Sequence, residues 1–262
     1  MPNSICFINQ KGGVGKTTIA HNTAYILATI HDKKVLLIDL DQQGNSSEIY
    51  LPDKNIEPSI SSIFRLKSPD INSIIRPAQV YSDIVKNMYI LHSNISLSQA
   101  LKEIPHRTYK EKILFNALQD IVVNYDYIII DCPASIEDSV INAIYFADNF
   151  IIPVEMGAFA ASAIQDVLEL IAEVKEFGNL QNLLSSKKVK FVKNKVDHRG
   201  VSFNKIIESE IKEILPYTIQ SYIRQSLYVS RAGIEKIPII MHPEVPLVVK
   251  SDYKSFVKEI IS

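Results

Sequence analysis

Short apolar runs alternate with segments of helical periodicity along the whole chain of 262 residues. Most of the runs are apolar throughout, which is typical of strands buried on both faces of a parallel sheet. The expected strands are Ile5–Asn9, Val35–Leu40, Met88–His92, Tyr127–Asp131, Phe150–Val154 and Val189–Asn194. The expected helices are Lys16–Thr29, Lys110–Val123, Ile136–Phe146, Ala160–Phe177, Ser202–Ile214 and Val248–Ile260. This alternation predicts an α/β fold with a doubly wound, mostly parallel sheet and helices on both faces.

One continuous domain, residues 1–262, is expected because no repeat, low-complexity tract or Pro/Gly/Ser-rich linker divides the chain. The least regular stretch is Gln43–Val85, in which four prolines interrupt any long helix or strand. These prolines are Pro52, Pro58, Pro69 and Pro77. The terminal amphipathic segment Val248–Ile260 is expected to pack its apolar side on the core of the same domain.

The composition fits a compact protein of a reducing compartment. Hydrophobic residues make up 47% of the chain, which is ample for a buried core and argues against intrinsic disorder. The 28 Lys and Arg and the 29 Asp and Glu give a net charge of −1, so no overall basic field indicates nucleic acid. Two cysteines, Cys6 and Cys132, are too few for a disulfide framework or a four-thiolate metal site. Neither a membrane span nor a secretory signal is predicted, and a cytoplasmic location is expected.

A glycine-rich loop follows the first expected strand and opens the first expected helix. Its residues are Lys11, Gly12, Gly13, Val14, Gly15, Lys16, Thr17 and Thr18. Glycines let backbone N–H groups converge on phosphate oxygens, and the start of the helix adds partial positive charge. In such a loop Lys16 neutralises the β- and γ-phosphates, and the Thr17 hydroxyl binds magnesium. The loop therefore predicts a P-loop nucleoside triphosphatase with Mg²⁺ as a cofactor; that the nucleotide is ATP is implied by the family resemblance given below.

Aspartates end two other expected strands. Asp39 and Asp41 are separated by one residue, so their side chains point to the same side of the sheet edge at which α/β proteins bind ligands. Asp131 ends an apolar run, which is the Walker B arrangement for holding the magnesium hydration shell. The six histidines show no paired-ligand spacing, so no metal site beyond the magnesium is expected.

The octapeptide Lys11–Thr18 resembles the deviant phosphate loop of the ParA/MinD family of P-loop ATPases, although Gln10 stands where the general pattern has glycine. The resemblance implies a homodimer that sandwiches ATP. It also implies that Lys11 reaches the phosphates bound by the partner, as an arginine finger does elsewhere. The expected nucleotide-binding residues are therefore the whole loop from Lys11 to Thr18.

The segment Asp39–Asn45 resembles the switch of the partition branch of this family, with Gln42 in place of the usual proline. The resemblance implies that Asp41 positions magnesium and the attacking water, and that Asp39 supports the phosphate loop. The expected catalytic residues are thus Lys11, Lys16 and Asp41. The expected magnesium ligands are Thr17, Asp41 and Asp131.

The resemblance covers nearly the whole chain and implies the short form of the partition ATPases, without an N-terminal helix-turn-helix. In this form, basic residues in the C-terminal part of the chain bind DNA without sequence preference. Arg224 matches the family arginine in position, Arg231 stands where the family usually has glutamate and adds a positive charge, and Lys236 follows nearby; these three are the expected DNA contacts. Asn194, at the end of a late strand, resembles the family residue that contacts adenine, although a role in structuring a loop is almost equally compatible with its place.

The sequence therefore predicts an ATP-dependent dimerising ATPase for plasmid or chromosome partition. The resemblance implies that it binds nonspecific DNA in the ATP state, lies on the nucleoid in that state, and is stimulated by a ParB-like centromere-binding protein. The alternatives are a MinD-like membrane-associated positioning ATPase and a ParA-like ATPase that positions a protein cargo. A nucleotide-binding scaffold that does not hydrolyse ATP is a further alternative. The membrane alternative is disfavoured because Asp252 and Glu259 lie among the lysines of the terminal segment.

Overall fold

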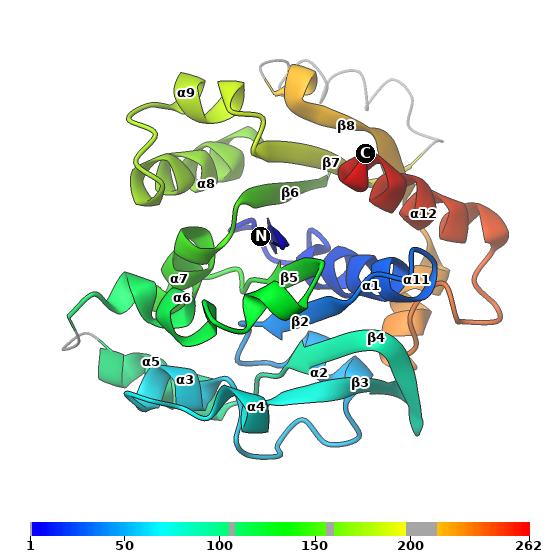
Figure 1. The fold of residues 1–262 in the computed structure, drawn as a ribbon. Helices are drawn as coiled ribbons and strands as arrows, with labels where there is room; N and C mark the ends of the chain where they lie inside the picture. The colour runs from blue at the N-terminus through cyan, green and yellow to red at the C-terminus, as the bar shows by residue number, and fades with distance from the viewer. Residues whose placement is uncertain (1, 105–107, 156–159, 198–213) are drawn as a thin grey trace.

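The computed structural model describes residues 2–104, 108–155, 160–197 and 214–262. One eight-stranded sheet runs through it in the order β3-β4-β2-β5-β1-β6-β7-β8 (Figure 1). The strands are β1 (Asn3–Phe7), β2 (Val35–Asp39), β3 (Ile75–Val80), β4 (Asp83–Leu91), β5 (Tyr127–Asp131), β6 (Asn149–Glu155), β7 (Val189–Val196) and β8 (Thr218–Arg224). All neighbouring strands are parallel except β3 and β4, which pair antiparallel at one edge. The expected doubly wound, mostly parallel sheet is confirmed.

Helices cover both faces of the sheet. One face carries α3 (Ser61–Arg65), α5 (Ser96–Glu103), α6 (Ile113–Leu118), α7 (Asp138–Phe146), α8 (Ala160–Val174) and α9 (Leu180–Ser185). The other face carries α1 (Lys16–Thr29), α2 (Asn45–Tyr50), α11 (Leu227–Ile234) and α12 (Leu247–Ile261). Successive strand residues point to opposite faces, so Cys6 packs in the first of these two cores and Phe7 in the second. Both faces of the central strands are therefore buried.

All six expected strands are present, but the edge strands β3 and β8 were missed. Because β3 contains Pro77 and pairs on one side only, its sequence lacks the apolar run of a central strand. The irregular stretch Gln43–Val85 holds α2, α3, α4 (Ile71–Ile74) and β3. The single helix expected over Lys110–Val123 is wrong: α6 is flanked there by two 3₁₀ turns, Lys110–Lys112 and Val122–Asn124. The helix expected over Ser202–Ile214 lies outside the described residues, apart from its last residue.

Candidate nucleotide-binding site

The candidate site lies at the carboxyl ends of three adjacent strands, β2, β5 and β1. The phosphate loop follows β1, while Asp39 and Asp131 are the last residues of β2 and β5. The two aspartates face each other across the parallel ladder, because Asp39 is in register with Asp131. The parallel register thus brings together three motifs that are far apart in the sequence.

The phosphate loop leaves the first turn of α1 open for an anion. Helix α1 begins at Lys16, no side chain caps its N-terminus, and its first turn holds no acidic residue. The free N–H groups and the helix dipole favour a bound phosphate. Gly15 has a φ of +97°, and a Cβ at this position would lie 2.2 Å from the Asn194 amide nitrogen. Only glycine fits there.

Asn194 structures the phosphate loop. Its Nδ2 donates a hydrogen bond of 2.7 Å to the carbonyl of Val14, and its side chain is buried. This is the loop-structuring role that the sequence left open beside an adenine contact. The residue also lies on the wall of a cleft of about 910 Å³ between the phosphate loop and the segment Ile223–Ile234, so it borders space large enough for a nucleotide.

The two loop lysines have different surroundings. The Nζ of Lys16 lies 3.3 Å from the carbonyl of Lys11, and the side chain is almost completely buried. Burial lowers the pKa of Lys16, and the nearby Asp131 carboxylate opposes this shift. The backbone N–H of Lys11 donates to the Asn9 side chain at 2.9 Å, which fixes the start of the loop. None of the described carboxylates pairs with the Lys11 ammonium group.

Thr17 and Asp131 form a candidate magnesium site. The Thr17 hydroxyl donates to Oδ1 of Asp131 at 3.2 Å, and the Ser46 hydroxyl donates to Oδ2 at 2.7 Å. Burial, followed by the charge of Asp39, raises the pKa of Asp131 to about 8. A buried carboxylate beside a hydroxyl suits a hard cation, which takes oxygen ligands and offsets the cost of burying charge. Among the described residues, no cluster of three His, Cys, Asp or Glu is present.

Asp39 holds the switch segment, so the expectation that it supports the phosphate loop is wrong. Its Oδ1 accepts from the backbone N–H of Asp41 at 3.0 Å, and its Oδ2 accepts from the N–H and hydroxyl of Ser47 at 2.9 and 2.7 Å. Burial raises the pKa of Asp39 to about 6. In the turn that follows, Asp41 accepts from the N–H of Gln43 at 2.9 Å and remains partly exposed. The turn then reaches α2 through Gly44, whose φ is +61°.

The three expected DNA contacts all have carboxylate partners. Arg224 binds Asp252 of α12 with Nε at 2.6 Å and Nη2 at 2.9 Å, and its backbone N–H donates to the same carboxylate. The guanidinium fork is thereby used inside the molecule, so a contact of Arg224 with DNA requires that phosphates compete with Asp252, and this contact stays a prediction. The pair forms because α12 lies against the end of β8, a relationship that local sequence does not reveal.

Arg231 and Lys236 are paired at the surface. The Nε of Arg231 lies 2.6 Å from Oε1 of Glu235, and its Nη1 pairs with the carboxylate of Glu244. The Nζ of Lys236 lies 2.9 Å from Oε1 of Glu48 on α2. Both side chains are about half exposed, at 49% and 53%. Exposed pairs of this kind contribute little to stability and can exchange a carboxylate for a phosphate.

A phosphate loop between β1 and α1, with a Walker B aspartate on the adjacent β5, defines a P-loop nucleotide-binding protein. A family model described as an AAA domain matches residues 3–185. The chain is 30% identical over 243 residues to the sporulation initiation inhibitor protein Soj of Bacillus subtilis, covering 92% of each chain. It is 34% identical over 173 residues to the chromosome partitioning protein ParA of Myxococcus xanthus, covering 66% of this chain and 59% of that one. The chain belongs to the ParA/MinD family of P-loop ATPases.

Solved structures share the fold. Cobyrinic acid a,c-diamide synthase of Mycobacterium smegmatis, with a bound ATP analogue and magnesium, gives a TM-score of 0.79 at 21% identity and covers 100% of this chain and 94% of that one. A substituted form of Cyanothece McdA in complex with ATP gives 0.80 at 19% identity, covering 99% and 96%. The cell division ATPase MinD of Pyrococcus furiosus gives 0.72 at 20% identity, covering 100% and 99%. None of the helices in the described part of the chain is long and apolar enough to cross a bilayer.

Proposed function

We propose that the protein is a magnesium-dependent ATPase that dimerises around ATP, binds nonspecific DNA in that state, and acts in plasmid or chromosome partition. The observation that carries the proposal is the Thr17–Asp131 pair beside the open first turn of α1. Family membership and the resemblance to Soj and ParA support the partition role. The ParB-like stimulating partner and the association with the nucleoid rest on the same resemblance.

The site residues have distinct roles in this proposal. Residues 11–18 bind the triphosphate through backbone N–H groups, and Lys16 exchanges the carbonyl of Lys11 for phosphate oxygens. Thr17, Asp131 and Asp41 would hold magnesium, which would neutralise charge on the phosphates. Asp41 also orients the attacking water, from a turn that Asp39 keeps in place.

Lys11 is the proposed contact between subunits. Its backbone is fixed by Asn9, while its ammonium group has no carboxylate partner among the described residues. An unpaired cation at the mouth of a phosphate site is suited to stabilise charge that develops on a neighbouring triphosphate. Arg231 and Lys236 remain proposed DNA contacts, on condition that phosphates displace Glu244, Glu235 and Glu48.

Two sedimentation assays test the proposal. The full chain should sediment with random-sequence DNA when ATP and magnesium are present, and should remain in the supernatant with ADP. Lys16→Ala should abolish ATP binding and, with it, the ATP-dependent sedimentation; retained ATP affinity would contradict the assignment of the phosphate loop. Sedimentation with anionic vesicles in place of DNA would favour the MinD-like alternative.

Helix α12 provides an observation against the membrane alternative. Its apolar residues Val249, Tyr253 and Phe256 are buried in the core beneath it, and the large apolar side chains that it exposes, Leu247 and Val248, lie only in its first turn. Positioning of a protein cargo would use the same nucleotide cycle. It is distinguished from partition by whether the stimulating partner binds a centromere or a protein.

A further inference from the structure

A β-turn over residues 41–44 carries Asp41, the residue proposed to orient the attacking water. Within the turn, the N–H of Gly44 donates to the carbonyl of Asp41 at 2.8 Å, and the N–H of Gln43 donates to the Asp41 carboxylate at 2.9 Å. The second position of the turn is Gln42, where proline is favoured because its ring fixes φ. Since Gln42 leaves φ free to vary, contacts from outside the turn have to hold it in place.

Lys54 binds this turn from the loop that follows α2. Its Nζ donates a hydrogen bond of 2.7 Å to the carbonyl of Gln43 and lies 3.4 Å from Oε2 of Glu48. The carbonyl that closes the turn belongs to Asp41, so the bond from Lys54 adds a restraint that the turn itself lacks. Asp39 holds the first residue of the turn through its backbone N–H, and Lys54 holds the third residue.

The turn and Lys54 are both fixed to the carboxyl end of β4. A Cβ added at Gly44 would lie 3.1 Å from Cδ of Lys54 and 2.5 Å from the carbonyl oxygen of Ser93, so the turn lies close against both residues. The carbonyl of Lys54 accepts a hydrogen bond of 3.4 Å from Nδ2 of Asn94, which follows β4. The side chain of Lys54 is only 24% exposed, so it has less rotamer freedom to lose than a lysine that extends into water.

We propose that Lys54 is a positioning residue for ATP hydrolysis, which holds the 41–44 turn and, through it, the carboxylate of Asp41. The inference rests on the proposed function, in which Asp41 orients the attacking water. A hydrogen bond from a charged donor is stronger than one between neutral groups, and a misplacement of about 1 Å in an active site can cost about 100-fold in rate. Because residues 11–18 bind the triphosphate, Lys54 acts on the rate of hydrolysis and not on the affinity for ATP.

The test compares the full wild-type chain with Lys54→Met, which keeps most of the side-chain volume and removes the ammonium group. In the nucleotide-free chain, hydrogen–deuterium exchange of peptides spanning residues 39–47 should be faster in the variant, because the turn opens more often. With ATP and magnesium, kcat should fall by about tenfold. KM and the affinity for a non-hydrolysable ATP analogue should stay close to those of wild type. Lys54→Arg, which keeps a cation, should restore part of both losses.

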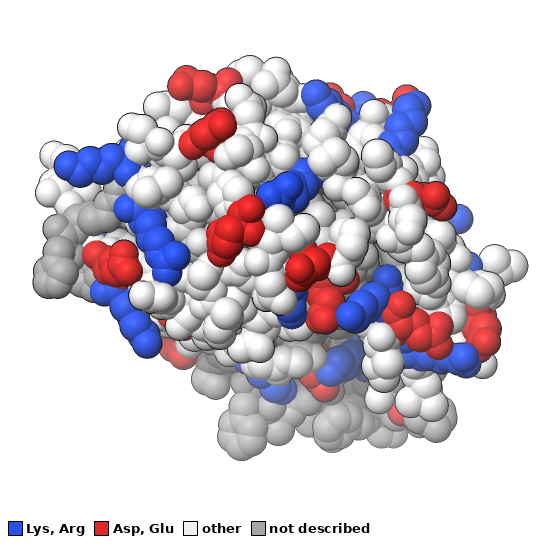
Figure 2. Space-filling model, turned by 90° about the horizontal axis from the view of Figure 1, so that it is seen from below, with Lys and Arg blue, Asp and Glu red and all other residues white. Residues whose placement is uncertain are grey.

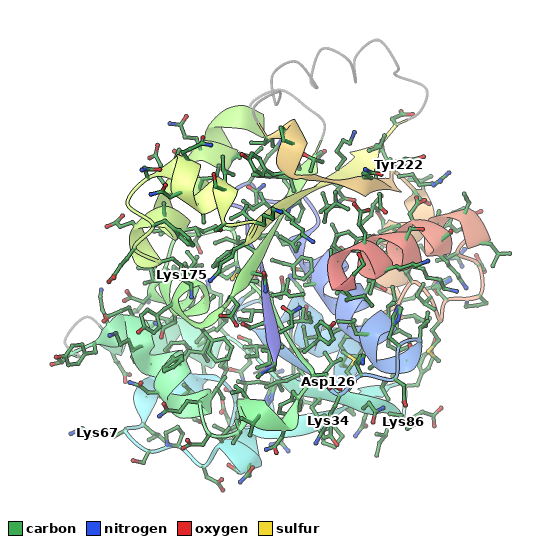
Figure 3. The ribbon with its side chains drawn as sticks, turned by 45° about the horizontal axis from the view of Figure 1, so that its top comes forward. Lys34, Lys67, Lys86, Asp126, Lys175 and Tyr222 are labelled. Atoms are coloured by element: carbon green, nitrogen blue, oxygen red, sulfur yellow. The ribbon has the colours of Figure 1, made fainter. Side chains whose placement is uncertain are left out.

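The matched control is Lys86→Met, which removes a lysine from another ion pair. Lys86 lies 3.1 Å from Asp32, and the two side chains are 80% and 74% exposed. Basic and acidic side chains are also interspersed on the face seen from below in Figure 2, and exposed pairs contribute little to stability. Figure 3 labels Lys86 together with Lys34 and Asp126 at the amino edge of the sheet, whereas the turn follows the carboxyl end of β2. The control should change neither exchange nor kcat. Equal effects of the two substitutions would assign them to net charge and overturn the proposal.

Gln42→Pro shows whether Lys54 acts through the turn. Neither Gln42 nor Gln43 has a positive φ, and no hydrogen bond in the described part of the chain uses the N–H of Gln42, so proline should fit there. In the Gln42→Pro background, Lys54→Met should lower kcat less than it does in wild type, because the proline supplies part of the restraint. Equal losses in the two backgrounds would show that the lysine does not act on the turn.

Glu48→Gln separates the bond to the turn from the ion pair. This variant removes the carboxylate partner of Lys54 and leaves the carbonyl of Gln43 available, so kcat should stay close to that of wild type. A loss of about tenfold in Glu48→Gln would overturn the proposal even if Lys54→Met fails to fold.

The remaining outcomes separate this inference from the proposed function. Unchanged exchange and kcat in Lys54→Met, with wild type hydrolysing ATP, would overturn the inference alone. Absence of magnesium-dependent hydrolysis by wild type would overturn the proposed ATPase and the inference with it.

Discussion

The hydroxyl of Ser46 donates to Oδ2 of Asp131 at 2.7 Å, and both residues are completely buried. Ser46 lies in the first turn of α2, directly after the switch turn, whereas Asp131 ends β5. The bond therefore joins the switch segment to the carboxylate that is proposed to bind magnesium. Its neighbour Ser47 makes the equivalent bond to Asp39. Two consecutive serines thus hold two adjacent strand-end carboxylates.

Ser46→Ala should weaken binding of the metal. Residues that orient a metal-binding carboxylate through hydrogen bonds commonly contribute 10–100-fold to metal affinity, so we expect a loss of about tenfold. The measurement is the dissociation constant of Mn²⁺, as a substitute for Mg²⁺, followed by electron paramagnetic resonance with a non-hydrolysable ATP analogue bound. This readout does not depend on turnover.

Ser47→Ala is the control for this effect. It also removes one buried hydroxyl from the same helical turn, but that hydroxyl contacts Asp39 and not Asp131. Both variants should lose stability, by about 1–3 kcal/mol for each hydrogen bond removed from a buried carboxylate. Only Ser46→Ala should change the Mn²⁺ dissociation constant. An equal change in both variants would show that the effect arises from general loosening of α2.

Asn194→Ala should reduce affinity for ATP and GTP equally. The Asn194 amide is engaged by the carbonyl of Val14, so its loss loosens the phosphate loop, which holds the part common to both nucleotides. If the side chain instead reads adenine, ATP affinity should fall and GTP affinity should not. Equilibrium binding of labelled ATP and GTP to the variant distinguishes these outcomes.

Gly15→Ala tests the same contact from the other side. The added Cβ meets the Asn194 amide at 2.2 Å, and a φ of +97° strains any residue with a side chain. The variant should lose stability and nucleotide affinity. The double variant Gly15→Ala with Asn194→Ala should recover only the part due to the clash, since the backbone strain persists. Full additivity of the two losses would contradict the contact.

His21 should make stability depend on pH in the acid range. Asn22 donates to its Nε2, its Nδ1–H faces the Tyr50 hydroxyl at 3.2 Å, and burial lowers the pKa of His21 to about 3. Below about pH 6.5 the unfolded chain binds a proton that the native chain does not. The free energy of unfolding should therefore decrease as the pH is lowered from about 6.5 to about 3, by up to about 1.4 kcal/mol for each pH unit.

The control for His21 is His21→Gln, which cannot take up the proton. Its free energy of unfolding, measured by urea denaturation from neutral pH to about pH 4, should show a shallower dependence than wild type. The variant can be less stable throughout, because the comparison uses the slope and not the absolute value. Parallel slopes in the two proteins would exclude His21 as the source.

Local sequence predicted the parts of the site that lie within one motif. The phosphate loop and the strand-end Asp39 and Asp131 are recognisable from residues that are close together in the sequence, so the spacing within each motif was sufficient to predict them. The partners of these residues depend on chain segments brought together by the sheet register and helix packing: Ser46 reaches Asp131 across 85 positions, and Asp252 reaches Arg224 across 28. No local sequence pattern indicates that two residues so far apart in the chain form a hydrogen bond. The edge strand β8 was missed for a related reason, since its ladder has a neighbour on one side only.

Exchanges at Arg224 and Asp252 should separate a structural role of the arginine from DNA contact. Their bidentate pair joins the end of β8 to α12, and the two side chains are 25% and 10% exposed. Arg224→Gln and Asp252→Asn should each lower the free energy of unfolding by about 1–3 kcal/mol, as for other hydrogen bonds to charged groups.

The effect on DNA affinity separates the two roles, because the two substitutions change the net charge in opposite directions. If Arg224 contacts phosphates, Arg224→Gln weakens DNA binding and Asp252→Asn, which frees the guanidinium, strengthens it. If the pair only anchors α12, both variants shift DNA affinity in the same direction, which is the result we expect from anisotropy measured with ATP and magnesium.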